Sequence, residues 1–478
     1  MISLPHPATT IAMFLATMAG LALLRPTFSS GPSPLLLPLF ATVLSSACLF
    51  LIGRGRVVLA TYMRVGFHIG TFAYFLSYPI LLPEEVDVII SDRTHLLVGL
   101  TLITTIVGFE VGYWIRGETR VADPETKGFV LTPTTKSRLL GCIVIGIAIW
   151  FLAVWLLSSA SGVPLNVLLF KMRKVLDEEL DNDVTFYRYL YEVLRGGLFL
   201  AASSAYLMLA GTVRRSLMFM ILCWLALLLC AVVGFLSGSR AMFLYSIMPI
   251  TLACWVMLGR ISGTYLRWLL AMAGAVALIV SWGAMSAIRD AGFLDYDADL
   301  LYVLLDDPGT HVAGAFNLYY GIAMIVDAFP DIFPYEHGRS VLALVFGWLP
   351  RSLWPDKPYT FALYANFIQG ETLEFRSASL AVGLAGEGYG NFGLLGALGW
   401  GTFMGLACRY GDAFIAHMTD CYLFKLLCAL LGGVWAAMIV RGGVPEMFYM
   451  GIFIILSQIV LAKYVFKDED RHTAPSGA

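Results

Sequence analysis

Hydrophobic and polar positions alternate along this chain in long blocks. Runs of mostly apolar residues are separated by short polar connections, and a run of roughly 17–25 such residues is long enough to cross a bilayer as a helix. About twelve runs meet this criterion, so the pattern predicts an all-α, polytopic membrane helical bundle. The runs cover residues 8–24, 34–53, 57–82, 94–116, 138–160, 186–210, 216–236, 241–259, 265–284, 389–408, 420–440 and 443–465.

The composition agrees with this pattern. Of 478 residues, 59% are hydrophobic and 13% are charged, whereas soluble domains have roughly 45–50% apolar and about 25% charged residues. No basic stripe or reading motif suggests nucleic acid as a partner. The cysteines form no CxxC pair, and no metalloprotease, serine-hydrolase or P-loop motif is present. The first run follows no basic residue, so we do not interpret it as a cleaved signal peptide.

Loop charges predict the orientation, because Lys and Arg are retained on the cytoplasmic side of a membrane. Basic residues gather in alternate connections, for example 117–138, whereas the intervening connection 83–93 is mostly acidic. This distribution predicts a multi-pass protein with both termini in the cytoplasm. The segment 285–388 is then a large outer loop of roughly 100 residues, far longer than an ordinary connection.

The loop is rich in Trp, Tyr, Phe and Leu, which predicts an ordered helical cap on the membrane surface. Its stretches 311–328 and 340–349 fit interfacial helices better than spans. The chain is thereby divided into four parts. Residues 1–284 hold spans one to nine, residues 285–388 form the non-cytoplasmic loop, residues 389–466 hold spans ten to twelve, and residues 467–478 form a cytoplasmic tail.

Several basic residues on the predicted outer side run against the positive-inside bias. Arginine can grip phosphate oxygens with two parallel hydrogen bonds, so a group of them at headgroup depth predicts a site for a phosphorylated lipid. A single boundary arginine often only snorkels to headgroups, and that alternative stays open for each residue. The group consists of Arg240, Arg289, Arg351, Lys357, Arg376 and Arg441.

A second charged cluster begins the sixth run. Arg188, Glu192 and Arg195 share one helix face. Charged residues so close to an apolar core usually face a bundle interior or a watery cavity. They can equally pair with one another and only hold the helix in register.

Acidic candidates are fewer. Glu387 lies in a glycine-rich segment at the outer mouth of the tenth run. A carboxylate there could accept a proton from a sugar hydroxyl, or it could hydrogen-bond backbone amides in a glycine-rich turn. His311 and His337 are alternatives in the outer loop.

Four short motifs carry a resemblance to a known family. GSR ends at Arg240, LPRSLWPDKP covers 349–358, a Ser-x-Ser follows Arg376, and GEGYGNFGLLG covers 386–396. Together with the many-span layout, the segment 238–405 resembles the Wzy-type oligosaccharide repeat-unit polymerases, which belong with the O-antigen polymerase and ligase group of membrane glycosyltransferases.

The resemblance implies a GT-C-like fold in the bacterial cytoplasmic (inner) membrane, with the active site on its outer face. A growing glycan on undecaprenyl diphosphate is there transferred to an incoming lipid-linked repeat unit in O-antigen, capsule or exopolysaccharide biosynthesis. The implied partners are polyprenyl-diphosphate-linked oligosaccharides as donor and acceptor, membrane lipid, a chain-length regulator and a flippase. The family uses no nucleotide sugar and usually no metal, so we expect no cofactor.

Roles follow as hypotheses. Glu387 would orient or deprotonate the acceptor, while Arg240, Arg289, Arg351 and Arg376 would hold the pyrophosphate and stabilise charge on the departing diphosphate. Stacking faces for sugar rings would come from Trp348, Trp354, Tyr359 and Tyr364. The residues expected to bind substrate are Arg351, Lys357, Arg376, Arg441, Arg188, Arg195, His311, Trp354 and Tyr389.

Two other functions stay open. An O-antigen ligase shares the lipid donor but delivers the glycan to a lipid A core, and a catalytic His311 or His337 would favour it. A transporter or flippase of lipid-linked sugars would place charges near the membrane midplane, and Arg64 and His68 in the third run keep this alternative open.

Overall fold

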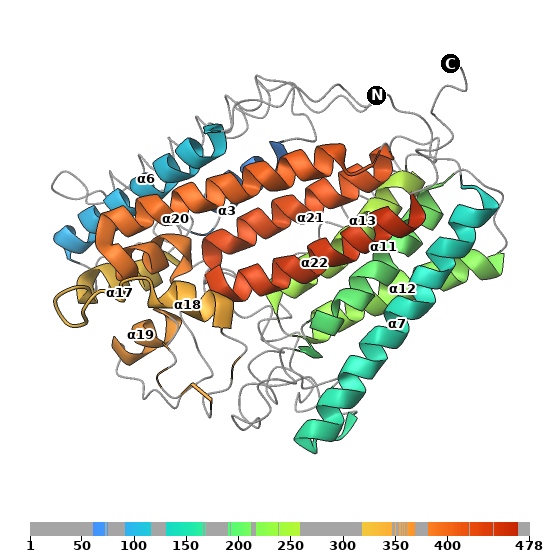
Figure 1. The fold of residues 1–478 in the computed structure, drawn as a ribbon, viewed down its shortest axis with the longest axis horizontal. Coiled ribbons are helices and arrows are strands. Elements are labelled where there is room, and N and C mark those ends of the chain that lie inside the picture. The colour runs from blue at the N-terminus through green and yellow to red at the C-terminus, as the bar shows by residue number, and fades with distance from the viewer. Residues whose placement is uncertain are drawn as a thin grey trace, which may run out of the picture.

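All regular structure described in the computed structural model is helical (Figure 1). The described residues are 61–71, 74, 91–115, 131–165, 168, 190–191, 193–211, 217–237, 239–258, 318–346, 349, 353–354, 356, 358, 361–368, 381–419, 421–442 and 444–466. The helices are α3 (Tyr62–Thr71), α6 (Asp92–Trp114), α7 (Pro133–Ser161), α11 (Gly196–Ala210), α12 (Leu217–Leu236), α13 (Arg240–Leu258), α17 (Leu318–Ala328), α18 (Arg339–Phe346), α19 (Phe361–Ile368), α20 (Gly383–His417), α21 (Tyr422–Arg441) and α22 (Val444–Val465).

Local sequence explains where the long helices begin. Ser91 caps α6 by accepting a hydrogen bond from the backbone N–H of Thr94 at 3.2 Å. Thr132 caps α7 in the same way, and Pro133 follows it at a position where its missing N–H costs nothing. Gly162, with φ 70°, ends α7 in the left-handed conformation that glycine adopts freely.

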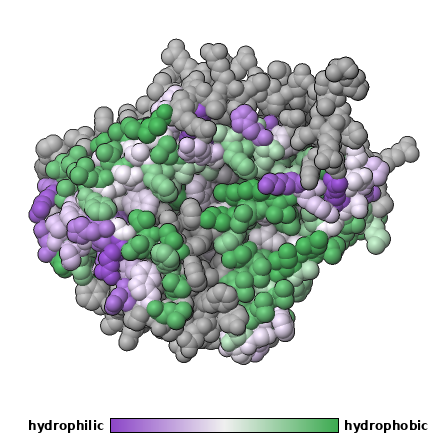
Figure 2. All heavy atoms as spheres, viewed as in Figure 1, coloured by the Kyte–Doolittle hydropathy of each residue, from purple (hydrophilic) through white to green (hydrophobic). Residues whose placement is uncertain are grey.

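Six helices in the described part of the chain are long and apolar enough to cross a membrane, namely α6, α7, α12, α13, α20 and α21. Large apolar side chains on α7 and α12 point outward, for example Trp155 at 58% and Met218 at 84% exposure. Figure 2 shows hydrophobic residues over the middle of the visible face and hydrophilic ones toward both ends. The chain is therefore consistent with a helical membrane protein.

The predicted runs correspond closely to these helices where the chain is described. Most differ by only a few residues from α6, α7, α12, α13, α21 and α22. The runs 57–82 and 186–210 are described in part, as α3 and α11. The runs 8–24, 34–53 and 265–284 lie outside the described residues. Within the predicted outer loop, 311–328 and 340–349 correspond to α17 and α18.

Small residues spaced four apart bring two helix pairs into backbone contact. On α3, Gly66 and Gly70 lie so close to α21 that a Cβ on Gly66 would collide with the backbone of Gly433. Gly401 and Gly405 on α20 lie equally close to α6. Such small-xxx-small patterns let membrane helices associate through close van der Waals packing.

The contacts also show the helix directions. On α6 and α20, residues 105 and 109 face residues 401 and 405, so the two helices run parallel. On α3 and α21, residues 66 and 70 face residues 433 and 437, and these helices are parallel as well. Both relations agree with the alternation of direction expected from the order of the predicted runs.

α20 is the main departure from the expected span 389–408. It begins at Gly383 and bends at Phe392 and Gly393, whose φ of 63° is in the left-handed region. Beyond the bend the chain reverses, because Gly388 packs against the backbone of Gly396 and Ala397. We call the end of the bundle at 391–393 the bend end, and the opposite end, where α20 leads into α21, the hairpin end.

Candidate functional site

A loop docks on the bend of α20 and forms the frame of the site. The backbone N–H of Glu336 donates to Gly390 O at 3.1 Å, and that of His337 donates to Asn391 O at 3.2 Å. The loop runs from α17 to α18 and carries the sequence YEHGRS at 335–340. It is therefore held against the glycine-rich motif by main-chain hydrogen bonds.

The Asn391 side chain completes this frame. Its Oδ1 accepts from the backbone N–H of Gly338 at 2.9 Å. Its Nδ2 donates to Ser340 Oγ at 2.7 Å and to the Glu387 carbonyl at 2.8 Å. Asn391 is 1% exposed, so these bonds are shielded from water. One side chain thereby connects the loop, α18 and the helix 383–391.

Glu336 occupies the centre of the docked loop. The Tyr364 hydroxyl donates a short hydrogen bond to its Oε1. Its Oε2 lies 3.6 Å from Arg339 Nε and is buried, without a hydrogen bond from any described residue. Arg339 also donates through Nη2 to the Asp356 carbonyl at 3.2 Å. The glutamate is thus linked to the LPRSLWPDKP motif.

Aromatic rings surround the same loop. Tyr335 lies 6.2 Å from Tyr389, and His337 lies 5.9 Å from Phe392, both with nearly perpendicular rings. Tyr389 is 5% exposed, whereas Phe392 is 50% exposed. Trp354 is half-buried and packs edge-on against a ring of α18 at 6.4 Å. Exposed ring faces of this kind can stack on sugars.

Three of the predicted arginines lie at helix ends. Arg195 precedes α11 as its N-cap and is 5% exposed, with its guanidinium 5.5 Å from the Tyr191 ring. Arg240 is the first residue of α13. Arg441 is the last residue of α21, with its guanidinium 5.9 Å from the Tyr74 ring.

The starts of α11 and α13 and the end of α21 do not reach the bend end: Arg441 lies next to Gly383, about 12 Å along the helix from Asn391. α11 runs parallel to α22, because Gly196 lies near Phe453 and Ser203 bonds Gln458. The starts of α11 and α13 lie level with each other, since Phe199 and Tyr245 are in ring contact at 6.4 Å. α21 ends where the helix 383–391 begins, because Gly383 abuts the Val440 carbonyl.

Glu387 lies on the same helix as Tyr389, one turn before Asn391. It is 2% exposed and sits within a helix, so the alternative of a glycine-rich turn is wrong. The glycines around it serve close packing: Gly388 contacts the chain beyond the bend, and Gly390 contacts the ring of Phe361. Eight other predicted site residues lie outside the described residues, namely Arg188, Arg289, Arg351, Lys357, Arg376, His311, Trp348 and Tyr359.

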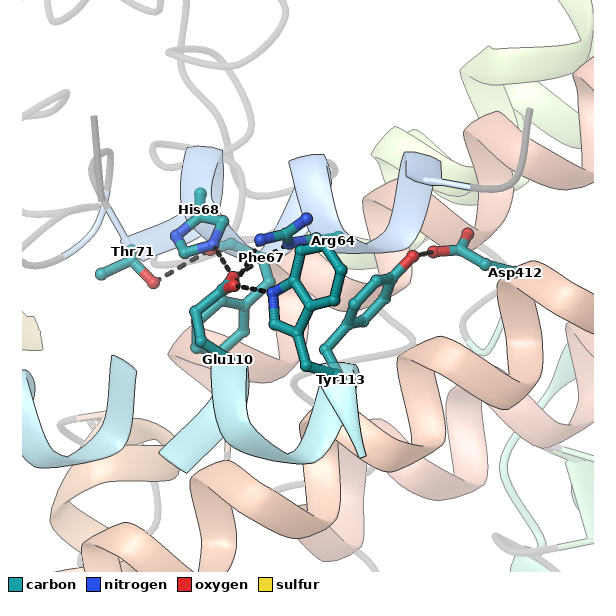
Figure 3. Close-up of polar contacts among 8 residues, drawn as sticks. Arg64, Phe67, His68, Thr71, Glu110, Tyr113 and Asp412 are labelled. Carbon is teal, nitrogen blue, oxygen red and sulfur yellow. Dashed lines mark hydrogen bonds and ion pairs between the residues drawn. The ribbon is translucent and has the colours of Figure 1, made fainter. Parts of the chain in front are cut away.

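A second polar cluster lies at the hairpin end; the sequence pointed to its Arg64 and His68 but not to its acids. Arg64 donates to both carboxylate oxygens of Glu110, with Nε–Oε1 at 3.0 Å (Figure 3). His68 Nε2 lies 2.8 Å from Oε1, and Trp114 Nε1 donates to Oε2 at 3.0 Å. His68 must donate here, because an ionised carboxylate only accepts. Glu110 therefore has four donors, from α3 and α6.

The same cluster continues to α20. Asp412 is fully buried and accepts from the Tyr113 hydroxyl at 2.8 Å and from the Met63 backbone N–H at 3.0 Å. The guanidinium groups of Arg64 and Arg409 lie 5.1 and 5.4 Å from the Tyr113 ring. We call this group, with Glu110, His68 and Trp114, the buried network.

The signal that could have revealed the buried network is the presence of acids inside or beside apolar runs. Glu110 interrupts the run 94–116, and Asp412 follows the run 389–408. Because a helix rises about 1.5 Å per residue, Glu110 lies about 27 Å along α6 from Asp92. The buried network and the bend end thus lie at opposite ends of the bundle.

No protein-family model, curated protein or solved structure matches this chain. The resemblance to the Wzy-type polymerases therefore stays a prediction, and the assignment of function depends on the geometry of the site.

Proposed function

We propose that this protein polymerises polyprenyl-diphosphate-linked oligosaccharide repeat units at the outer face of the bacterial cytoplasmic membrane. The bend end would face outward, and the reaction would transfer a glycan from a lipid diphosphate to an acceptor sugar hydroxyl. The leaving diphosphate already departs readily, so positioning and electrostatic stabilisation can supply most of the rate.

The observation that carries the proposal is the docking of the loop 335–340 on the glycine-rich motif at the bend end. Arg195 and Arg441 lie at helix ends that point toward this end, with Arg441 about 12 Å short of it, and Arg240 begins α13. The helix 383–391 and the docked loop complete this end with carboxylates and ring faces. A diphosphate needs cations, and a sugar needs acceptors and flat apolar faces, so this set fits a lipid-linked oligosaccharide.

A second candidate is an O-antigen ligase, which would use the same donor. The observation that favours it is His337, which lies exposed at the bend end beside Glu336. Its φ of 48° is in the left-handed region, which non-glycine residues rarely adopt and which clusters at functional sites. A histidine there could serve as the base toward a lipid A core acceptor.

The transporter alternative has less support. It needs charges near the midplane that are accessible from both sides, whereas the buried network lies about 27 Å along α6 from its start, close to one boundary of an apolar core roughly 30 Å thick. The carboxylate of that network is also fully occupied by donors.

The test uses the purified protein in detergent with a lipid-diphosphate-linked repeat unit, without nucleotide sugar or metal. We expect a ladder of products from the wild type and its loss in Arg240→Ala. The matched control is Arg138→Ala, which removes an arginine that bonds the Tyr464 carbonyl at the hairpin end, and it should keep the ladder. Transfer only after lipid A core is added would assign the ligase, and no transfer to either acceptor would contradict both.

A further inference from the structure

Glu336 differs from the carboxylates of the buried network in what its oxygens contact. Glu110 accepts four hydrogen bonds, and Asp412 accepts hydrogen bonds from Met63, Arg64 and Tyr113. Glu336 accepts one, from Tyr364, and its Oε2 makes none with any described residue. Arg339 Nε forms an ion pair with this oxygen at 3.6 Å but donates no hydrogen bond to it, and a buried acceptor without a hydrogen bond needs an explanation. A substrate hydroxyl at Oε2 would supply one.

We propose that Glu336, rather than Glu387, is the carboxylate that removes the proton from the acceptor hydroxyl. The inference rests on the proposed function. As the acceptor oxygen bonds to the anomeric carbon of the donor, the bond from that carbon to the diphosphate oxygen breaks. The electron pair leaves with the lipid diphosphate, the hydroxyl proton moves to Glu336 Oε2, and solvent later takes it up.

The surroundings of Glu336 hold its carboxylate in one orientation. Tyr364 donates to Oε1, and its ring is packed among aromatic neighbours, 5.5 Å from Phe329 and 5.8 Å from Phe361. The backbone of Glu336 is bonded to Gly390. A base positioned this firmly needs no reorganisation when the acceptor arrives. Tyr364 is therefore a positioning residue for Glu336.

Glu387 is less suited to the same role. It lies four residues before Asn391, which places it about 6 Å further from the bend end along the helix. Its carbonyl is bonded by the Asn391 side chain. A sugar hydroxyl would have to pass the docked loop to reach it, whereas the Glu336 side chain, 10% exposed, lies in that loop.

The rings near Glu336 fit a sugar acceptor. Tyr335 and His337 flank it in sequence, and Phe392 presents a half-exposed face next to His337. Arg339 links Glu336 to the Asp356 carbonyl, so the glutamate is tied to the segment that carries the LPRSLWPDKP motif. The expected substrate at this point is the non-reducing sugar of a lipid-linked repeat unit.

The experiment compares Glu336→Gln and Glu387→Gln in the product-ladder assay, with kcat and acceptor KM measured across pH. Glutamine keeps the size of the side chain and an oxygen for Tyr364 but cannot take a proton. We expect Glu336→Gln to lower kcat by about 100-fold or more, with little change in acceptor KM and loss of the acid limb of the pH–rate profile. Asp331→Asn, the same class of change on an exposed side chain nearby, is the matched control and should leave the rate unchanged.

Each outcome decides the inference. A folded Glu336→Gln protein with a rate near that of the wild type overturns it, and a loss confined to Glu387→Gln moves the base to Glu387. If Glu336→Gln does not fold, Tyr364→Phe decides: it should lower kcat several-fold at constant KM, and an unchanged kcat overturns the inference. A wild type without any ladder overturns the proposed function and this inference together.

Discussion

The two ends of the bundle use charged residues in opposite ways. At the hairpin end, each carboxylate of the buried network is paired within the protein, so the charges are neutralised where they lie. At the bend end, Glu336 keeps an oxygen without a hydrogen bond from the described residues. Carboxylates whose oxygens are hydrogen-bonded within the protein indicate a structural role, whereas a buried carboxylate oxygen without a hydrogen bond indicates a place for a ligand.

Helix packing also differs between the two ends of the bundle. α3 packs on α21, and α6 on α20, through small residues that bring the helix backbones into direct contact. At the bend, α20 reverses and a loop replaces direct helix packing. Residues on such a loop, supported by rigid helices, are common positions for binding and catalysis.

The largest expected effect is in the buried network. Glu110→Ala would leave Arg64, 6% exposed, without its carboxylate partner. Removing one member of a buried pair costs about 3–5 kcal/mol, so we expect a large loss of thermal stability in detergent. Activity per folded molecule should be unchanged, since the bend end lies far away. A loss below about 1 kcal/mol would mean that water reaches the network and would revive the transporter alternative.

The next effect concerns the contact between α6 and α20. A Cβ on Gly401 would collide with the backbone of Thr105, so Gly401→Ala should lower stability by about 1–3 kcal/mol. Gly399→Ala on the same helix is the matched control, because nothing lies within 4 Å of that Cβ. It should leave the melting temperature unchanged or raise it slightly. Equal effects of the two variants would contradict the role of this contact.

Much of the fold could be predicted from the sequence because the bilayer imposes a simple rule. Long apolar runs become helices, and α12, α13 and α21 lie where the hydrophobic pattern placed them. The bend at Phe392 and Gly393 could not be predicted in this way. It depends on a reversal stabilised by contacts between Gly388 and residues beyond the bend, which hydropathy does not record.

The site was predictable only in part for a related reason. Position relative to the apolar runs was enough to suggest Glu387, which lies one turn from the bend, and also Arg441 and Arg195, which lie further from it along the bundle. Glu336 was not proposed, because it lies far from α20 in sequence and its importance comes from docking on Gly390. Arg64 and His68 of the buried network were noticed, but their pairing with Glu110 and the link to Asp412 were not, because the partners come from three separate helices.

A smaller and more local effect is expected at the frame of the site. Asn391→Ala removes three hydrogen bonds that join the loop, α18 and the helix 383–391. We expect a loss of about 1–3 kcal/mol, earlier proteolytic cleavage in the loop 331–340, and a lower rate. Asn391→Asp keeps the acceptor for Gly338 and should recover part of the loss. Unchanged cleavage would show that the backbone bonds alone hold the loop.

The smallest effect is expected for an exposed arginine–carboxylate ion pair at the bend end, which has the same chemistry as the buried pair of Arg64 and Glu110. Arg93 and Asp331 lie 3.8 Å apart, and their side chains are 78% and 64% exposed. Water screens such a pair, so Asp331→Asn should change stability by less than about 0.5 kcal/mol. The comparison with Glu110→Ala, measured by the same thermal unfolding assay, separates burial from charge. If Asp331→Asn lowered stability as much as Glu110→Ala, burial would not determine the cost of losing a carboxylate. The contrast between the hairpin end and the bend end would then fail.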